Sequence, residues 1–149
     1  MSENDFKSAA VVRAEVPDAW NRVTESIISA AIEVHSLLGP GLSEKLCEEA
    51  MDFELRQRSM SFTRQVAIRV AYKTILLPEQ RLDLLVESLV IVELKAVDRV
   101  PDAHLAALVG YLHAADMPLG LLINFHAAHL KQGIYRRINS RAILSRAQP

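Results

Sequence analysis

Residues 81–95, RLDLLVESLVIVELK, constrain the fold of this chain more than any other stretch. They read as two apolar strands, about 80–86 and 89–95, joined by a short turn, with Asp83 in the first and Glu93 and Lys95 at the end of the second. A carboxylate in a buried strand must be paired, hydrogen-bonded or bound to a metal, because losing its water otherwise costs several kcal/mol. The two acids and the lysine are therefore a candidate site at one end of a sheet.

The length of the turn decides whether the two acids meet. Side chains alternate along a strand, so a two-residue turn at Glu87 and Ser88 would set Asp83 opposite Val92 and away from Glu93. A three-residue turn or a bulge pairs Asp83 with Glu93, and we predict one of these features. The alternative for Asp83 is an ordinary ion pair with Arg81 or Lys95.

Hydrophobic spacing predicts the elements around this hairpin. A helix is expected from Asp18 to about residue 38, and a second, capped by Ser43, to about residue 58 with Leu42, Leu46, Ala50 and Phe53 as its buried stripe. A half-buried strand through Val66, Ile68 and Val70 should run to about residue 72 and turn at residues 73–74. A helix over 101–115, a buried strand over 119–125 and a last helix over about 127–138 complete the pattern.

This order predicts the fold class. Hairpins join antiparallel strands and a strand–helix–strand crossover joins parallel ones, so we expect an α/β fold with a mixed sheet of four to five strands flanked by helices. The expected organisation is an N-terminal tail over 1–17, one domain over 18–140 and a C-terminal tail over 141–149. The arginines of 136–146 either grip phosphates or lie at a solvated helix end.

Composition narrows the class of protein. The 149 residues carry a net charge of −1, which argues against a global nucleic-acid footprint but leaves room for a local basic strip. The single cysteine, Cys47, excludes an intrachain disulfide and a cysteine-based zinc cluster, and we expect it to be a buried, inert thiol. No apolar run approaches the roughly 20 residues of a membrane span, and the N-terminus lacks signal-peptide features. We expect a cytoplasmic protein that is not bound to a membrane.

Several segments together resemble the GxxExxY family, which is related to the PD-(D/E)XK nuclease-like superfamily. They are AIEVH at 31–35, GPGL at 39–42 followed by Glu44, RLD at 81–83, VELKA at 92–96, YL at 111–112 and GLLINF at 120–125. The chain departs from the family pattern at Cys47, where a tyrosine is expected, and at Ala107, where a glutamine is usual.

The resemblance implies a role for each polar residue. Asp83 and Glu93 would hold Mg²⁺, with Mn²⁺ as a possible substitute and the Leu94 carbonyl as a further ligand, and Lys95 would orient or deprotonate the attacking water. Glu44 would support the metal, although an acid in the first turn of a helix is also stabilised by the helix dipole alone. Tyr111 and His104 are possible supporting residues.

Two classes of function follow from these features. The first is a Mg²⁺-dependent phosphodiesterase acting on nucleic acid through an activated water. The second is a nuclease-fold protein that no longer cuts and instead binds a protein partner, itself or nucleic acid, which the near-neutral charge, Cys47 and Ala107 favour. A zinc site built from the five histidines is rejected because no HExxH-type spacing occurs.

Overall fold

A computed structural model describes residues 14–147 of the chain. The element order agrees with the prediction as far as residue 124. The elements are α1 (Asp18–Leu38), α2 (Glu44–Gln57), β1 (Phe62–Ile68), β2 (Ala71–Tyr72), β3 (Ile75–Leu76), β4 (Gln80–Val86), β5 (Val90–Lys95), α3 (Asp102–Ala114), β6 (Leu119–Asn124), the 3₁₀ helix η2 (Leu130–Gly133), β7 (Ile134–Ile138) and α4 (Ser140–Arg146).

The central sheet has five strands in the order β1–β4–β5–β6–β7. Strands β5 and β6 are parallel and are joined through α3, whereas the other neighbouring strands are antiparallel. This arrangement confirms the predicted mixed sheet, because a crossover helix is what a parallel pair requires. It also makes β5, which carries Glu93 and Lys95, the middle strand of the five.

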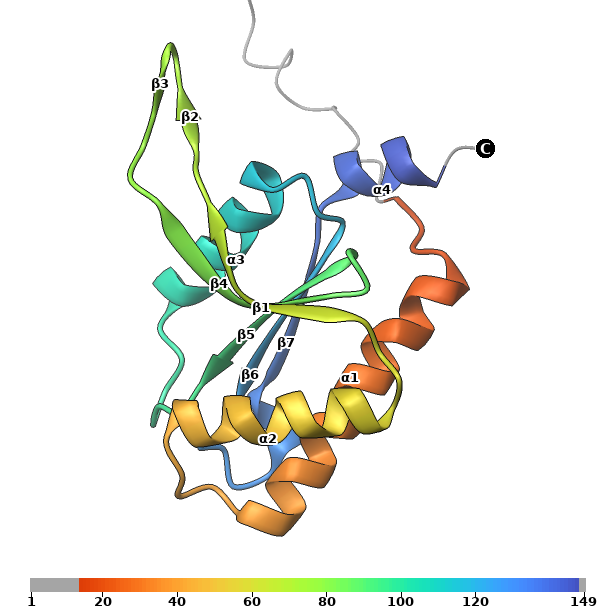
Figure 1. Ribbon diagram of the computed structural model, residues 1–149, viewed down its shortest axis with the longest axis vertical. Coiled ribbons are helices and arrows are strands. Elements are labelled where there is room, and N and C mark those ends of the chain that lie inside the picture. Colours follow the sequence, from red (N-terminus) through yellow and green to blue (C-terminus); the bar gives the residue numbers. More distant parts are fainter. Residues whose placement is uncertain (1–13, 148–149) are drawn as a thin grey trace, which may run out of the picture.

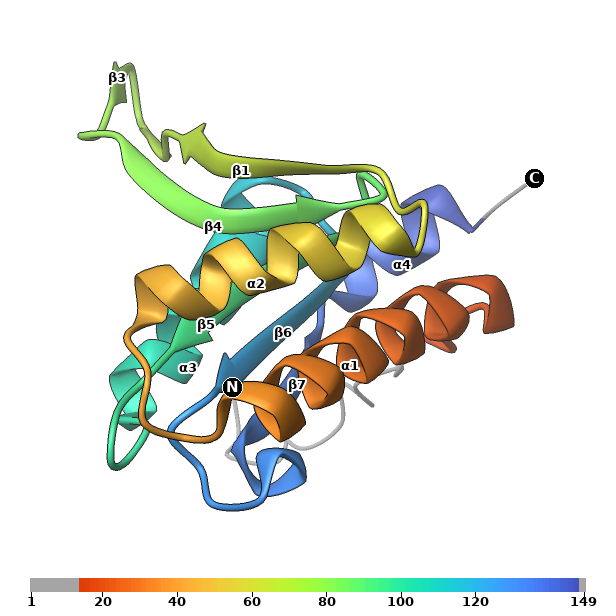
Figure 2. The same ribbon diagram turned by 60° about the horizontal axis from the view of Figure 1, so that its bottom comes forward.

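Helices cover both faces of the sheet (Figure 2). Helices α1 and α2 pack on one face in a core that includes Ile27, Met51 and Val92, and α3 packs on the other through Leu108 and Leu112. Strands β5 and β6 are buried almost throughout, as expected of strands enclosed by two layers. Gly120 lets α3 pack closely on β6, because an added Cβ would lie 3.0 Å from Leu108 Cδ1.

The two N-terminal helices begin and end where the sequence indicates. Gly39 follows α1 with φ of +74°, a conformation that glycine adopts without steric cost. Ser43 caps α2 by accepting a hydrogen bond from the Leu46 backbone N–H at 3.4 Å. The chain therefore reverses over residues 39–43 and brings the start of α2, with Glu44, toward the end of β5.

The predicted buried stripe of α2 was wrong at Leu46 and Phe53, whereas Leu42 and Ala50 do pack against the core. Leu46 and Phe53 are 52% and 60% exposed, and the buried residues are Cys47, Met51 and Leu55. Both sets have helical spacing, so the sequence alone does not settle which one faces the sheet. The burial of Cys47 agrees with prediction, and burial raises the pKa of its thiol.

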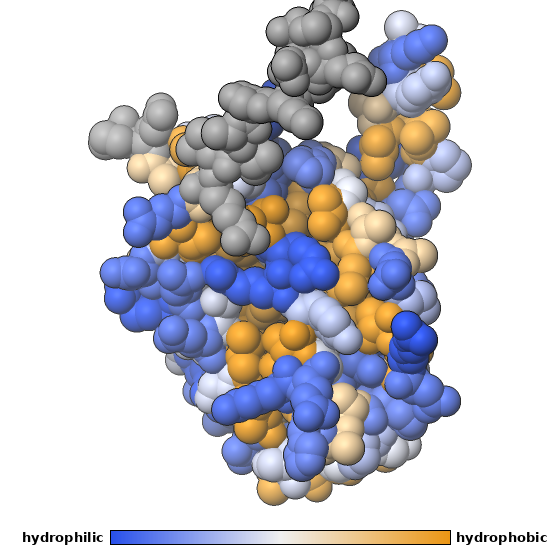
Figure 3. Space-filling model, turned by 180° about the vertical axis from the view of Figure 1, so that it is seen from behind, coloured by the Kyte–Doolittle hydropathy of each residue, from blue (hydrophilic) through white to orange (hydrophobic). Residues whose placement is uncertain are grey.

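A short arm, residues 70–77, takes the place of the end of the strand that was expected to run to about residue 72. Strand β1 ends at Ile68 rather than near residue 72, and β2 and β3 form a separate hairpin that stands away from the sheet (Figure 1). Five large apolar side chains on this arm are between 37% and 61% exposed, and Figure 3 shows the arm projecting from the body of the molecule. They are Val70, Tyr72, Ile75, Leu76 and Leu77.

The C-terminal part also differs from prediction. Instead of one helix over 127–138, the chain forms η2 and the edge strand β7, whose partner is β6. The β-branched Ile134 and Ile138 pack against the core from this strand, so sheet pairing overrides the helical spacing. Residues 141–146, expected in a tail, belong to α4, where Ala142 and Ile143 are buried. Of the expected N-terminal tail, residues 1–13 lie outside the described residues.

Among the helices of residues 14–147, none has the length and apolar character needed to cross a bilayer.

Candidate active site

The turn between β4 and β5 has the length that brings the two acids together. It consists of Glu87, Ser88 and Leu89, and the ladder pairs Val86 with Val90 and Leu84 with Val92. Continuing this register by one residue sets Asp83 opposite Glu93. The prediction of a turn longer than two residues is therefore confirmed.

At Asp83 and Glu93, hydrogen bonds to side chains replace the backbone pairing of β4 and β5. The Asp83 N–H donates to Glu93 Oε1 at 3.2 Å, and the Leu94 N–H donates to Asp83 Oδ2 at 2.8 Å. Each carboxylate thus accepts a hydrogen bond from a backbone N–H of the opposite strand. This exchange fixes both side chains between β4 and β5 and leaves further oxygen lone pairs on each acid.

Burial makes the ionised form of these acids costly. Glu93 is only 8% exposed, and burial, followed by the nearby charge of Asp83, raises its pKa to about 7. Burial also raises the pKa of Asp83, against the opposing effect of the Leu94 hydrogen bond. Burial therefore disfavours the ionised form of both side chains, and a bound cation would offset that cost.

Neither acid forms the ordinary ion pair that was the alternative explanation. Within residues 14–147, Arg81 pairs with Glu79 at 3.6 Å, and no salt bridge joins Asp83 or Glu93 to a basic side chain. In that same range Lys95 has no ion pair either. Lys95 lines a cavity together with Glu93, and its charge opposes the rise in the pKa of both acids.

A cavity of about 250 Å³ opens beside Glu93 on the face covered by α3. Its lining consists of Glu93, Lys95, His104, Ala107, Tyr111 and Leu122. His104 Nδ1 is buried and has no hydrogen-bond partner among the residues that the structure describes. The expected supporting residues His104 and Tyr111 thus share a cavity with Glu93 and Lys95, and the small Ala107 side chain leaves space between them.

A second cavity of about 200 Å³ lies on the α2 face of the same strand end. Its lining consists of Glu44, Lys45, Glu48, Gln65, Asp83 and Leu94. Glu44 Oε1 accepts a hydrogen bond from the Ala96 N–H at 3.3 Å, directly after β5. Glu44 therefore contacts the chain next to Lys95, and the helix dipole is not its sole structural role.

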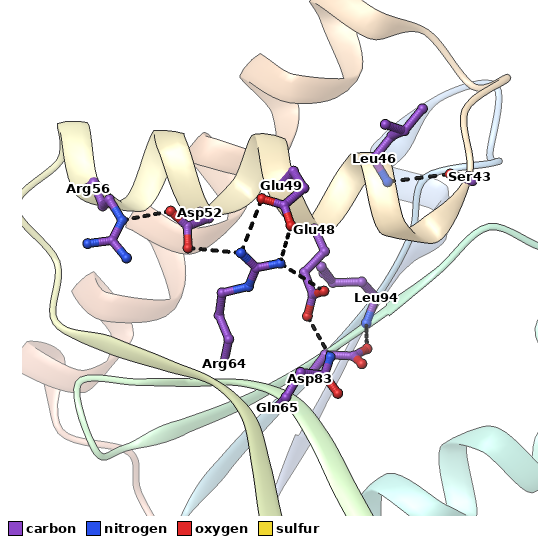
Figure 4. A network of polar contacts seen from close by, with 10 residues as sticks. All are labelled: Ser43, Leu46, Glu48, Glu49, Asp52, Arg56, Arg64, Gln65, Asp83 and Leu94. Carbon is purple, nitrogen blue, oxygen red and sulfur yellow. Dashed lines mark hydrogen bonds and ion pairs between the residues drawn. The ribbon is translucent and has the colours of Figure 1, made fainter.

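Three polar residues near the site were not predicted. Glu48 accepts hydrogen bonds from Gln65 at 2.8 Å and from Arg64 at 3.2 Å, which links α2 to β1 beside Asp83 (Figure 4). Buried Asn124, at the end of β6, binds both the N–H and the C=O of Val97 and so holds the loop after Lys95. A polar residue ending an apolar strand was a usable signal for Asn124, whereas Glu48 and Gln65 had none.

The two carboxylates suit a hard divalent cation that keeps several waters better than they suit a zinc ion. No group of three or more histidine, cysteine, aspartate or glutamate side chains in the described part of the chain is arranged to hold a metal. Mg²⁺ commonly takes one or two carboxylates and keeps several waters, whereas zinc sites use three or four protein ligands. Asp83 and Glu93 lie next to each other and have no cationic partner among residues 14–147, so they match the first requirement.

Comparison with models of protein families places the chain in one superfamily. The model of the PD-(D/E)XK nuclease superfamily matches residues 21–138, which include all six candidate site residues. The chain belongs to the PD-(D/E)XK nuclease superfamily. A search of curated proteins and a search of solved structures each found no significant match.

Proposed function

We propose that this protein is a divalent-metal-dependent phosphodiesterase that hydrolyses nucleic acid, within the GxxExxY branch of its superfamily. The observation that carries the proposal is the hydrogen-bonded placement of half-buried Asp83 and buried Glu93 between β4 and β5, near Lys95. Within residues 14–147 none of these three side chains forms an ion pair. The single cysteine suits a reducing compartment, and we propose the cytoplasm.

Asp83 and Glu93 would hold the metal, for which Mg²⁺ is the proposed ion and Mn²⁺ a substitute. When bound, the ion supplies Lewis-acid chemistry, activating water and offsetting charge on the phosphate. The backbone hydrogen bonds from Leu94 and Asp83 keep the carboxylates in place without using all their oxygens. Such preorientation by neighbouring donors raises metal affinity.

Lys95 would act on the substrate from the α3-side cavity. Its ammonium group can donate hydrogen bonds to the attacking water and stabilise negative charge that develops on the phosphate. His104 and Tyr111 line the same cavity and would contact the substrate. Glu44, held by the Ala96 N–H, would support the loop that follows Lys95.

Cleavage assays with single- and double-stranded DNA and RNA test the proposal. Cleavage should require Mg²⁺ or Mn²⁺, and Lys95→Ala should lower the rate by about 100-fold or more if the ammonium stabilises the transition state. Lys131→Ala, a change of an exposed lysine on η2, is the matched control and should keep the rate. Absence of cleavage of all four substrates, or a Lys95→Ala rate equal to that of the wild type, would contradict the proposal.

The arm favours a second candidate function, a partner-binding or self-associating module without catalysis. Its five exposed apolar side chains have the character of an interaction surface, because water solvates such a patch poorly. Sedimentation of the wild type and of Leu76→Ser over a range of concentrations tests self-association. A sedimenting mass that rises with concentration in the wild type but not in Leu76→Ser supports this function. If both proteins stay monomeric at every concentration, self-association is contradicted.

A further inference from the structure

Gln65 has an unusual backbone in the middle of β1. Its φ is +50°, a left-handed conformation that residues with a Cβ rarely adopt within a strand. The ladder between β1 and β4 pairs Arg64 with Leu84 and Val66 with Leu82, but Gln65 and Asp83 do not pair. The irregularity therefore lies directly opposite the proposed metal-binding aspartate.

The surroundings hold Gln65 in this conformation. Its amide Nε2 donates to Glu48 Oε1 at 2.8 Å, and its backbone carbonyl accepts from Arg81 Nη1 at 3.3 Å. The preceding Arg64 bonds to three acids of α2 (Figure 4). A disfavoured backbone persists only where such contacts hold it in place, and such sites cluster near functional centres.

The conformation changes which face of the sheet each side chain meets. Alternate residues of a regular strand share a face, yet Arg64 binds α2 while Val66 packs in the α3-side core. The same switch occurs across the ladder, where Leu84 lies in the α1- and α2-side core and Leu82 in the α3-side core.

Asp83 stands at the point of this switch. Regular alternation would place its side chain on the α3 face with Leu85. Instead Asp83 lines the α2-side cavity together with Gln65, and its carboxylate accepts the Leu94 N–H. The irregular backbone at Gln65 thus coincides with the orientation of Asp83 toward the Leu94 N–H.

We propose that Gln65 is a positioning residue whose left-handed backbone keeps Asp83 out of regular pairing and turned toward Leu94 and the metal. The inference rests on the proposed function only where it concerns the metal, because the Asp83–Leu94 hydrogen bond exists without one. A residue change that restores regular strand geometry should release this bond and weaken metal binding. A change that tolerates positive φ should preserve both.

The test compares Gln65→Val with Gln65→Gly. Valine is stiff and strongly disfavours positive φ, whereas glycine adopts it freely, and both changes remove the side-chain amide. Gln65→Val should speed hydrogen exchange of the Leu94 amide toward the rate in Asp83→Ala and lower Mn²⁺ affinity by about 10-fold or more. Gln65→Gly should keep both near the wild-type values. Gln65→Ala serves if the valine variant does not fold.

Exchange at the Val92 amide separates positioning from general destabilisation. Val92 lies in the buried core of the same strand, and its protection should stay unchanged in all variants. Equal effects of valine and glycine, or no effect of valine on Leu94, would overturn the inference, as would parallel loss of protection at Val92. If the wild type binds no Mn²⁺, the proposed function fails, while Leu94 exchange still decides the role of Gln65.

Discussion

Replacing Glu93 with glutamine should make the metal-free protein more stable at pH 8. The pKa of Glu93 is raised from 4.5 to about 7, chiefly by burial and then by the charge of Asp83. Because one pKa unit corresponds to about 1.4 kcal/mol, ionised Glu93 costs the folded state on the order of 3 kcal/mol. Glutamine keeps an Oε1 atom that can accept the Asp83 N–H but carries no charge.

The pH dependence shows why Glu93→Gln should be more stable than the wild type rather than less stable. Below pH 4.5 Glu93 is protonated in both states, so the variant and the wild type should be about equally stable. Between pH 4.5 and 7 the unfolded chain releases the proton first, which lowers the stability of the wild type. The advantage of Glu93→Gln should therefore grow over this interval and be complete above pH 7. The raised pKa of Asp83 acts in the same direction in both proteins.

Urea unfolding at pH 4 and pH 8 measures the effect. Glu25→Gln, an exposed position on α1, is the control and should change the free energy of unfolding little at either pH. Adding Mg²⁺ at pH 8 should stabilise the wild type and not Glu93→Gln, since a ligand that binds only the folded state raises its stability. A Glu93→Gln variant that is no more stable than the wild type at pH 8 would refute the account of Glu93 as a destabilising buried charge.

Three further substitutions test the structure around the site. Arg64→Ala should cost about 1–2 kcal/mol of unfolding free energy, less at high salt, because three acids of α2 lose their shared partner; urea titrations at two salt concentrations measure this. Asn124→Ala should cost about 2–3 kcal/mol by leaving the Val97 backbone without its partners, and unchanged stability in thermal melts would contradict it. Gly120→Ala should cost about 1–3 kcal/mol in the same melts because its Cβ meets Leu108, and Leu108→Ala in the same chain should recover part of the Gly120→Ala loss.

The sequence predicted most of the sheet because local signals there agreed with the tertiary packing. Apolar strands, a turn longer than two residues and a crossover helix left few topologies for residues 80–124. Prediction failed where two readings had similar local support. Helix α2 has two apolar stripes, and packing against the sheet selects Cys47 and Met51 over Leu46 and Phe53. Pairing with β6 likewise converts residues 134–138 from an expected helix into a strand.

The sequence indicated which residues form the candidate site but not the contacts that surround them. Asp83, Glu93 and Lys95 stand out in the sequence as charged residues within apolar strands. Burying a charge costs free energy unless the charge is paired, hydrogen-bonded or bound to a metal. Nothing local in the sequence shows that Gln65 takes a positive φ or that Glu48 reaches across from α2 to bind it. Such contacts join residues far apart in the chain and depend on how a helix sits over the sheet edge.

Calorimetric titration with Mn²⁺ tests the central claim most directly. The wild type should bind the ion, and Asp83→Asn, which removes the charge and nearly preserves the shape, should lose at least about 10-fold in affinity. Asp18→Asn, on the exposed start of α1, is the matched control and should bind like the wild type. Loss confined to Asp83→Asn would place the ion between β4 and β5. Equal binding by all three proteins, or no binding by the wild type, would contradict a metal site at Asp83 and Glu93.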